Sequence, residues 1–134
     1  MGNDRDAEGR AYDGSYRDLR VWQDAMSLAE ECFRLSRQLP REEVYGLSSQ
    51  IRRAAVSIAA NIAEGHGREQ NRPFIQSLRI AQGSLKELET HLILIERVRM
   101  AAPETVGPLL THCDTLGRML RGLIRARQTR EVEP

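Results

Sequence analysis

The side chains that could perform acid–base or metal chemistry are too few and too scattered to form a recognisable enzyme site. Di-iron helical bundles carry Glu-x-x-His motifs on two helices, with further glutamates pointing inward. Here Glu87 and His91 are four residues apart, and Glu64 and His66 flank an expected helix end, but neither pair has a counterpart. We therefore expect surface or capping residues, and we predict no metal and no cofactor.

Nucleophilic catalysis is not indicated either. His112 directly precedes Cys113, and neighbouring residues of a helix point about 100° apart, so the imidazole is badly placed to activate that thiol. Three serines lie in the expected second helix, and none of them has a histidine at helical spacing. They are Ser48, Ser49 and Ser57. The sequence accordingly predicts a protein that is not an enzyme.

Arginine residues are a stronger indication of binding. Arg118, Arg121 and Arg125 recur at helical spacing and would share one face, while Arg68 and Arg72 lie near the start of another expected helix. Two interpretations remain open: a solvated helix face, or a surface that contacts the phosphates of RNA or DNA. An oligomer would repeat such a patch and add the fields of its copies.

A line of polar side chains between residues 45 and 65 is a second candidate site. At about 100° per residue they share one helix face. We call them the polar stripe, and they are Gln50, Arg53, Ser57, Asn61 and Glu64. They are either hydrogen-bonded to a neighbouring helix or subunit, where buried polar groups fix register, or open to a ligand or a nucleic-acid backbone.

The rest of this helix lacks the charged outer half of an ordinary surface helix. Its core stripe is Leu47, Ile51, Ala54, Ala55, Ile58 and Ile62. The remaining positions are mostly small residues, namely Val56, Ala59, Ala60 and Ala63. We therefore expect a second surface that packs closely against something other than the intrachain core.

The elements that position these residues follow from hydrophobic periodicity, which indicates helices and no strands. Apolar residues alternate steps of four and three across 74–95 and form the strongest seam. Pro40 ends the first helix, Gly65 suits a left-handed C-cap of the second, and Pro73 and Pro103 open the next two. The predicted helices span about 16–39, 43–64, 72–99 and 103–127.

Short connections between long helices predict an all-α, antiparallel up-down-up-down four-helix bundle across 16–128, which we expect to assemble as a ring. The segment 65–68 follows a helix and lacks Gly-Lys-Ser/Thr, so it is predicted to be a tight turn rather than a phosphate-binding loop. Residues 1–15 are expected to form a flexible tail, and 129–134 a frayed end.

Composition narrows the function further. The chain has 134 residues and a formal net charge of +1, so no global field draws it to nucleic acid or membrane. Cys32 and Cys113 are expected to fill the core. No apolar run approaches the ~18 residues that a membrane span needs, and the N-terminus does not resemble a signal peptide. A cytoplasmic protein is expected.

The sequence resembles the four-helix-bundle proteins named after the 23S rRNA intervening sequences that encode some of them. The residues that carry the resemblance are Tyr16-Arg-Asp-Leu-Arg-Val-Trp-Gln-Asp-Ala25, Tyr45-Gly-Leu-Ser-Ser-Gln-Ile-Arg-Arg-Ala54, Ser57-Ile-Ala-Ala-Asn-Ile-Ala-Glu-Gly65, Phe74, Leu78, Ala81 and Gly83-Ser-Leu-Lys-Glu-Leu-Glu-Thr90. The resemblance implies a homopentamer without enzymatic activity. A related accessory protein of diversity-generating retroelements is markedly basic and binds nucleic acid and a reverse transcriptase, whereas this chain is nearly neutral.

We therefore expect a non-catalytic homo-oligomer, with five subunits, that binds RNA or DNA weakly through Arg68, Arg72, Arg118, Arg121 and Arg125. The alternative is a scaffold or adaptor for a protein partner encoded nearby, such as a reverse transcriptase, without nucleic-acid contact.

Overall fold

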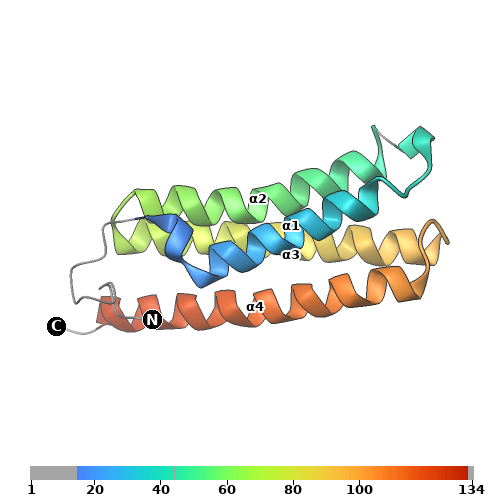
Figure 1. Cartoon of the computed structure of the whole chain (residues 1–134). Coiled ribbons are helices and arrows are strands. Elements are labelled where there is room, and N and C mark those ends of the chain that lie inside the picture. The colour runs from blue at the N-terminus through green and yellow to red at the C-terminus, as the bar shows by residue number, and fades with distance from the viewer. Residues whose placement is uncertain (1–14, 44, 133–134) are drawn as a thin grey trace.

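The computed structural model describes residues 15–43 and 45–132. Through these residues run the α-helices α1 (Arg20–Ser36), α2 (Leu47–Gly67), α3 (Asn71–Arg97) and α4 (Pro103–Val132), with the short 3-10 helices η1 (Tyr16–Asp18) and η2 (Arg41–Glu43). The four α-helices lie side by side along one long axis (Figure 1). Nearly all of the tail expected at 1–15 lies outside the described residues, as do the last two residues of the expected frayed end.

Each α-helix packs against two others, because α2 contacts α1 and α3, and α4 contacts α3 and α1. The α1–α2 and α3–α4 connections lie at one end of the bundle, and the α2–α3 connection lies at the other (Figure 1). All four α-helices contribute aliphatic side chains to the buried core, such as Leu28, Ile58, Leu88 and Leu116. Each fully buried Leu or Ile contributes about 1.5–3 kcal/mol. The all-α class predicted from the periodicity is confirmed for the described residues.

The start and end of α1 differ from the predicted range of 16–39. Leu19 is extended, with φ −73° and ψ 125°, so the helix begins at Arg20. The Tyr16 ring instead packs edge-on against Trp22, with ring centroids 5.1 Å apart. At the other end the Ser36 hydroxyl donates to the Phe33 carbonyl at 2.8 Å, and the Ser36 carbonyl accepts from the hydroxyl of Ser48 in α2 at 3.3 Å. Buried Ser48 thus ties two helices together.

The prediction that Gly65 forms a left-handed C-cap is wrong. Helix α2 continues to Gly67, and Gly65 is buried inside it. A Cβ atom at Gly65 would collide with the side chain of Ser77 in α3, so the glycine permits a close crossing of the two helices. The chain leaves the helical conformation at Glu69, which has a φ of 59°. The segment 65–68 is therefore mainly helix, and the turn follows it.

Helix α3 ends earlier than predicted, and helix α4 ends later. Helix α3 stops at Arg97, and Arg99 takes a left-handed φ of 64° before Pro103 opens α4. Helix α4 runs to Val132 rather than to 127, although Pro108 lies inside its second turn. Pro108 lacks an amide N–H and so cannot donate to the Glu104 carbonyl, although the intrahelical bonds of α4 have already begun at Val106, whose N–H donates to the Ala102 carbonyl.

Candidate functional site

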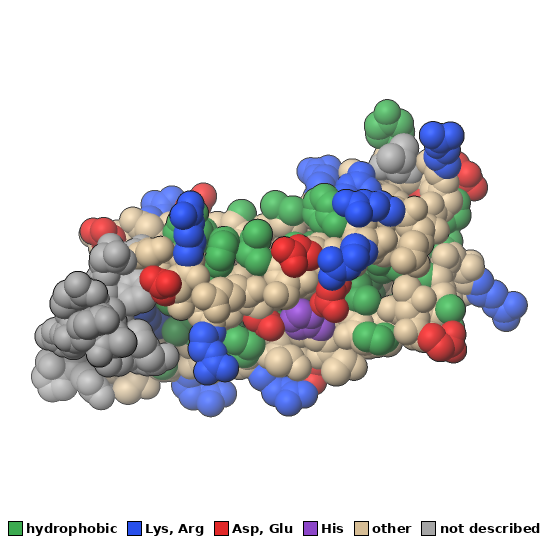
Figure 2. Space-filling view, viewed as in Figure 1, with side chains coloured by type: hydrophobic (Ala, Val, Ile, Leu, Met, Phe, Trp, Pro, Cys, Tyr) green, Lys and Arg blue, Asp and Glu red, His purple; other side chains and the backbone are tan. Residues whose placement is uncertain are grey.

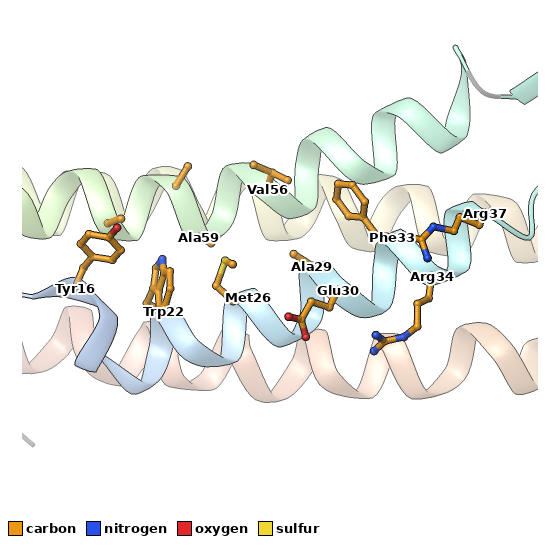
Figure 3. Close-up of a pocket in the computed structure, with 12 residues that line it drawn as sticks. Tyr16, Trp22, Met26, Ala29, Glu30, Phe33, Arg34, Arg37, Val56 and Ala59 are labelled. Atoms are coloured by element: carbon orange, nitrogen blue, oxygen red, sulfur yellow. The ribbon is translucent and has the colours of Figure 1, made fainter.

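An apolar groove of about 640 Å³ runs between α1 and α2 (Figure 3). Small side chains form much of its lining, namely Ala29, Ala59, Ala60 and Ala63. Larger apolar side chains flank them, and of these Met26 is 38% exposed and Val56 48% exposed. Tyr16 and Trp22 lie at one end, while Arg34 and Arg37 lie at the other (Figure 3). We call this feature the α1–α2 groove.

The groove explains why the apolar residues of α1 form two stripes. Ala25, Leu28, Cys32 and Leu35 are buried in the core. Trp22 and Phe33 are only half-buried and line the groove instead. The helix therefore presents one apolar face to its own bundle and a second one outward.

The middle of the polar stripe is satisfied within the chain. The hydroxyl groups of Ser57 in α2 and Ser84 in α3 share a hydrogen bond of 2.8 Å. The Asn61 amide donates to the Ser57 carbonyl at 2.8 Å and to the Ser57 hydroxyl at 3.1 Å. The Ser57–Ser84 bond joins α2 to α3, whereas the Asn61 bonds lie within α2 and fix the amide beside Ser57.

The ends of the polar stripe are solvent-exposed. Glu64 forms an ion pair with Arg68 at 3.6 Å. Gln50 and Arg53 of α2 line a second groove of about 560 Å³, together with Glu87 of α3. Phe33 and Val56 line both grooves, so the two adjoin there.

Two of the five arginines predicted to bind nucleic acid form ion pairs with acidic side chains. Arg68 is paired with Glu64, and Arg118 is paired with Asp114 on its own helix. Arg121 and Arg125 are exposed on the same helix. These arginines therefore carry less unpaired positive charge than the sequence pattern indicates.

The end of α4 nevertheless lies against the start of α3. The Asn71 amide donates to the Arg127 carbonyl at 2.8 Å, and the Arg127 guanidinium lies 4.9 Å from the centre of the Phe74 ring. Exposed Arg72 follows Asn71 directly. The structure thus brings Arg72 to the same end of the bundle as Arg125, two regions more than 50 residues apart in sequence.

A different group of arginines surrounds the junction of the two grooves. Arg34 and Arg37 line the α1–α2 groove beside Phe33 (Figure 3), and Arg52 and Arg53 line the second groove beside the same ring. Figure 2 shows basic side chains gathered around hydrophobic side chains on the surface where α1 and α2 adjoin. We call these four arginines with Phe33 the arginine corner. Sequence reasoning missed it, because the residues come from two helices and share no local period.

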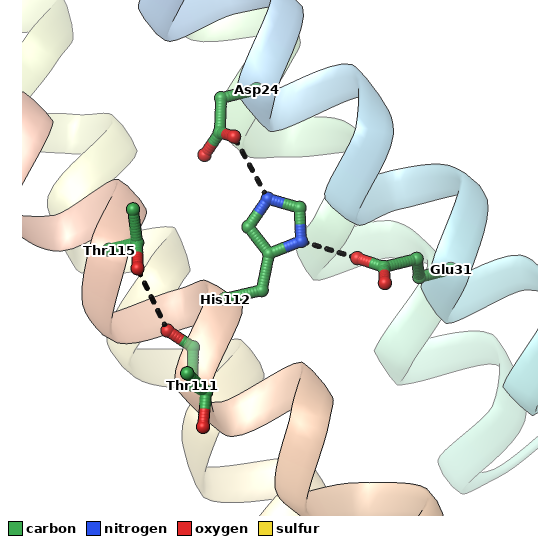
Figure 4. A network of polar contacts seen from close by, with 5 residues as sticks. All are labelled: Asp24, Glu31, Thr111, His112 and Thr115. Carbon is green, nitrogen blue, oxygen red and sulfur yellow. Dashed lines mark hydrogen bonds and ion pairs between the residues drawn. The ribbon is translucent and has the colours of Figure 1, made fainter.

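A polar cluster joins α4 to α1 (Figure 4). The imidazole of His112 faces two carboxylates, with its Nε2 atom 3.0 Å from Asp24 Oδ1 and its Nδ1 atom hydrogen-bonded to Glu31 Oε1. A neutral imidazole has one N–H group and an imidazolium has two, so only the imidazolium donates to both. Burial opposes protonation, but the hydrogen bonds and negative charges of Glu31 and Asp24 outweigh it and raise the pKa of His112 above its ordinary value.

The cysteines are placed for packing rather than reaction. Burial raises the pKa of both the Cys32 and Cys113 thiols to about 12, so they remain protonated at neutral pH. Within the part of the chain that the structure describes, no group of His, Cys, Asp and Glu side chains is arranged to hold a metal ion.

Comparison with known proteins places the chain in a family. Residues 17–122 match the family model described as the 23S rRNA-intervening sequence protein. The chain belongs to this family. The resemblance drawn from its motifs is therefore confirmed. A comparison with curated proteins finds no match.

A solved structure supports this membership. It is a protein with unknown function from the S23 ribosomal protein family of Bacteroides thetaiotaomicron, 27% identical to the present chain. The two structures superimpose with a TM-score of 0.72, and the matched region covers 78% of the present chain and 97% of the other chain.

Among the described residues, no helix combines the length and apolar character needed to cross a membrane.

Proposed function

We propose that this family member is a non-catalytic helical bundle that associates with copies of itself through the α1–α2 groove. The observation that carries the proposal is the alanine-lined apolar channel left uncovered between two helices of one chain. Small side chains let a further helix approach closely, and the half-buried Trp22 and exposed Met26 would gain burial when it does. The net charge of +1 opposes such association only weakly.

The finer arrangement is also a proposal. The family resemblance favours an antiparallel up-down-up-down order of helices within each chain and a ring of five chains. The connections at alternating ends of the bundle support the first part (Figure 1). Association through a lateral groove supports the second, because a heterologous contact closes a ring of five when it rotates each chain by a fifth of a turn, and otherwise gives an open filament.

The test is the mass of the protein in solution for two matched variants. Ala60 lines the groove and Ala126 is an exposed residue of α4. We expect multi-angle light scattering to give several times the 15.2 kDa chain mass for the wild type and for Ala126→Glu, but about one chain mass for Ala60→Glu. Circular dichroism checks that both variants keep their helices. A monomeric wild type at micromolar concentration would refute self-association, and an intact Ala60→Glu assembly would refute this surface.

A second candidate function is weak RNA or DNA binding at the end of the bundle where α3 starts and α4 ends. It is supported by the Asn71–Arg127 hydrogen bond, which brings Arg72 and Arg125 to one end. Arg121 continues this surface along α4, whereas Arg68 and Arg118 contribute less because acidic partners lie beside them. Each phosphate contact would make the affinity fall with salt.

An electrophoretic shift of structured RNA across a salt series tests this second function. Binding at low salt that weakens with salt, and that weakens further in Arg121→Glu and Arg125→Glu, is the expected result. Absence of binding at low salt would refute it and leave the scaffold or adaptor role, for a protein partner in the cytoplasm.

A further inference from the structure

The arginine corner has the features of a protein-binding site. Arg34, Arg37 and Arg53 are exposed, and within the described part of the chain no carboxylate pairs with them. Arg52 is held in place by a hydrogen bond of 3.4 Å to the Ser36 hydroxyl. The cationic groups therefore come from both walls of the junction, and Phe33 and Val56 provide an apolar floor between them.

The charge distribution selects the class of partner. Glu30 lies in the α1–α2 groove and Glu87 in the second groove, so each pair of arginines has one acidic neighbour. A nucleic-acid backbone carries a negative charge at every phosphate and would meet both glutamates. A peptide can instead place its carboxylates opposite the arginines and put an uncharged residue between them.

We propose that the arginine corner binds an acidic peptide segment of a protein partner. A short apolar anchor of one or two large side chains of the peptide packs on Phe33 and Val56. Carboxylates on one side of this anchor pair with Arg34 and Arg37, and a carboxylate on the other side pairs with Arg53. Guanidinium groups suit this role because they bind carboxylates through two parallel hydrogen bonds. The Gln50 amide, which lines the same groove, adds a group that can bond to peptide main chain.

The proposal does not rest on self-association. The alanine-lined stretch of the α1–α2 groove is the proposed contact between copies, and the corner lies where that groove meets the second one. A monomeric protein that binds the acidic peptide would contradict self-association but support the arginine corner. An oligomer that does not bind the peptide would support self-association but contradict the arginine corner, so the two failures are distinguishable.

The test is a calorimetric or NMR titration with the synthetic peptide Gly-Glu-Glu-Leu-Phe-Glu-Glu-Gly. The comparison probes are the same peptide with Gln in place of every Glu, the same peptide with Ser in place of Leu and Phe, and a single-stranded oligouridine. We expect the first peptide to bind most tightly, with NMR shifts centred on Phe33 and Val56. Equal binding of the oligouridine at the same residues would overturn the peptide assignment in favour of nucleic acid.

Matched charge reversals complete the test. Arg37→Glu and Arg53→Glu, one from each wall, should each weaken peptide binding by about tenfold, since each removes an attraction and adds a repulsion. Arg79→Glu makes the same charge change at an exposed residue of α3 that lines neither groove, and should leave the affinity within about twofold. Equal losses in all three variants would show a general charge effect and overturn the site. No detectable binding of the acidic peptide to the folded wild type would overturn it as well.

Discussion

Replacement of His112 by glutamine should destabilise the protein and remove part of its dependence on pH. The imidazole side chain is 19% exposed, and the two carboxylates that it joins, Asp24 and Glu31, are 27% and 33% exposed. Glutamine keeps a hydrogen-bonding amide but cannot carry the positive charge. The link between α4 and α1 would therefore lose its charged member.

The magnitude follows from the burial of the cluster. A hydrogen bond to a charged group contributes about 1.5–3 kcal/mol when buried, and partial exposure reduces that value. The Asp24 Oδ2 atom is already buried without a hydrogen-bond partner among the described residues. Loss of the imidazolium charge would therefore leave a partly buried carboxylate without the positive charge that compensates it. We expect a total loss of about 2 kcal/mol, which is about 6–10 °C in Tm for a chain of this size.

The sign of the pH dependence is determined by the direction of the pKa shift. The pKa of His112 is raised in the folded state above 6.5, so the imidazolium stabilises the fold fully below pH 6.5. That contribution is lost as the pH rises through the folded pKa. The charges that act on His112 are those of Glu31 and Asp24, whereas Lys86 and Glu89 of α3 act on the adjacent Cys113 thiol. The stability difference between wild type and His112→Gln should therefore shrink from pH 6 to pH 9.

Thermal unfolding at fixed protein concentration between pH 6 and pH 9 measures this difference. His91→Gln is the matched control, because His91 pairs with Glu87 at 3.3 Å within one helix and joins no second element. The control should lose no more than about 0.5 kcal/mol. NMR titration of the imidazole provides an independent measurement. A His112 pKa at or below 6.5, or a variant with the same Tm and pH slope as wild type, would refute the reasoning.

Three further outcomes follow from the packing. Gly65→Ala should destabilise by about 1–3 kcal/mol because the new methyl group meets Ser77; an unchanged denaturation midpoint would contradict the close crossing of α2 and α3. Ser84→Ala should cost about 1 kcal/mol by leaving Ser57 without its cross-helix partner, and chemical denaturation with an unchanged midpoint would count against that bond. Both cysteine thiols, whose pKa burial raises to about 12, should react with a disulfide reagent at pH 8 only as fast as the protein unfolds. Rapid reaction of the native protein would show that they are accessible.

The periodicity of the sequence was sufficient to determine the helices and most of the core. The seam predicted for residues 74–95 is buried throughout in α3, because which residues share a helix face depends only on their spacing along the chain. The motifs in 16–90 likewise indicated the family. Sequence periodicity also indicated that α2 has a second packing face, and the alanines of that face line the α1–α2 groove.

Contacts between helices could not be obtained in this way, since they depend on how each helix is rotated and how closely it crosses its neighbour. Gly65 has the residue type of a C-cap, yet it lies inside α2 at the point where Ser77 of α3 approaches too closely for a side chain to fit. His112 is 88 residues from Asp24, and no local pattern links them. The arginine corner likewise exists only because α1 and α2 bring Phe33 and Val56 together. Local spacing determined the elements and their apolar faces, whereas only the tertiary packing decided which polar and charged groups meet.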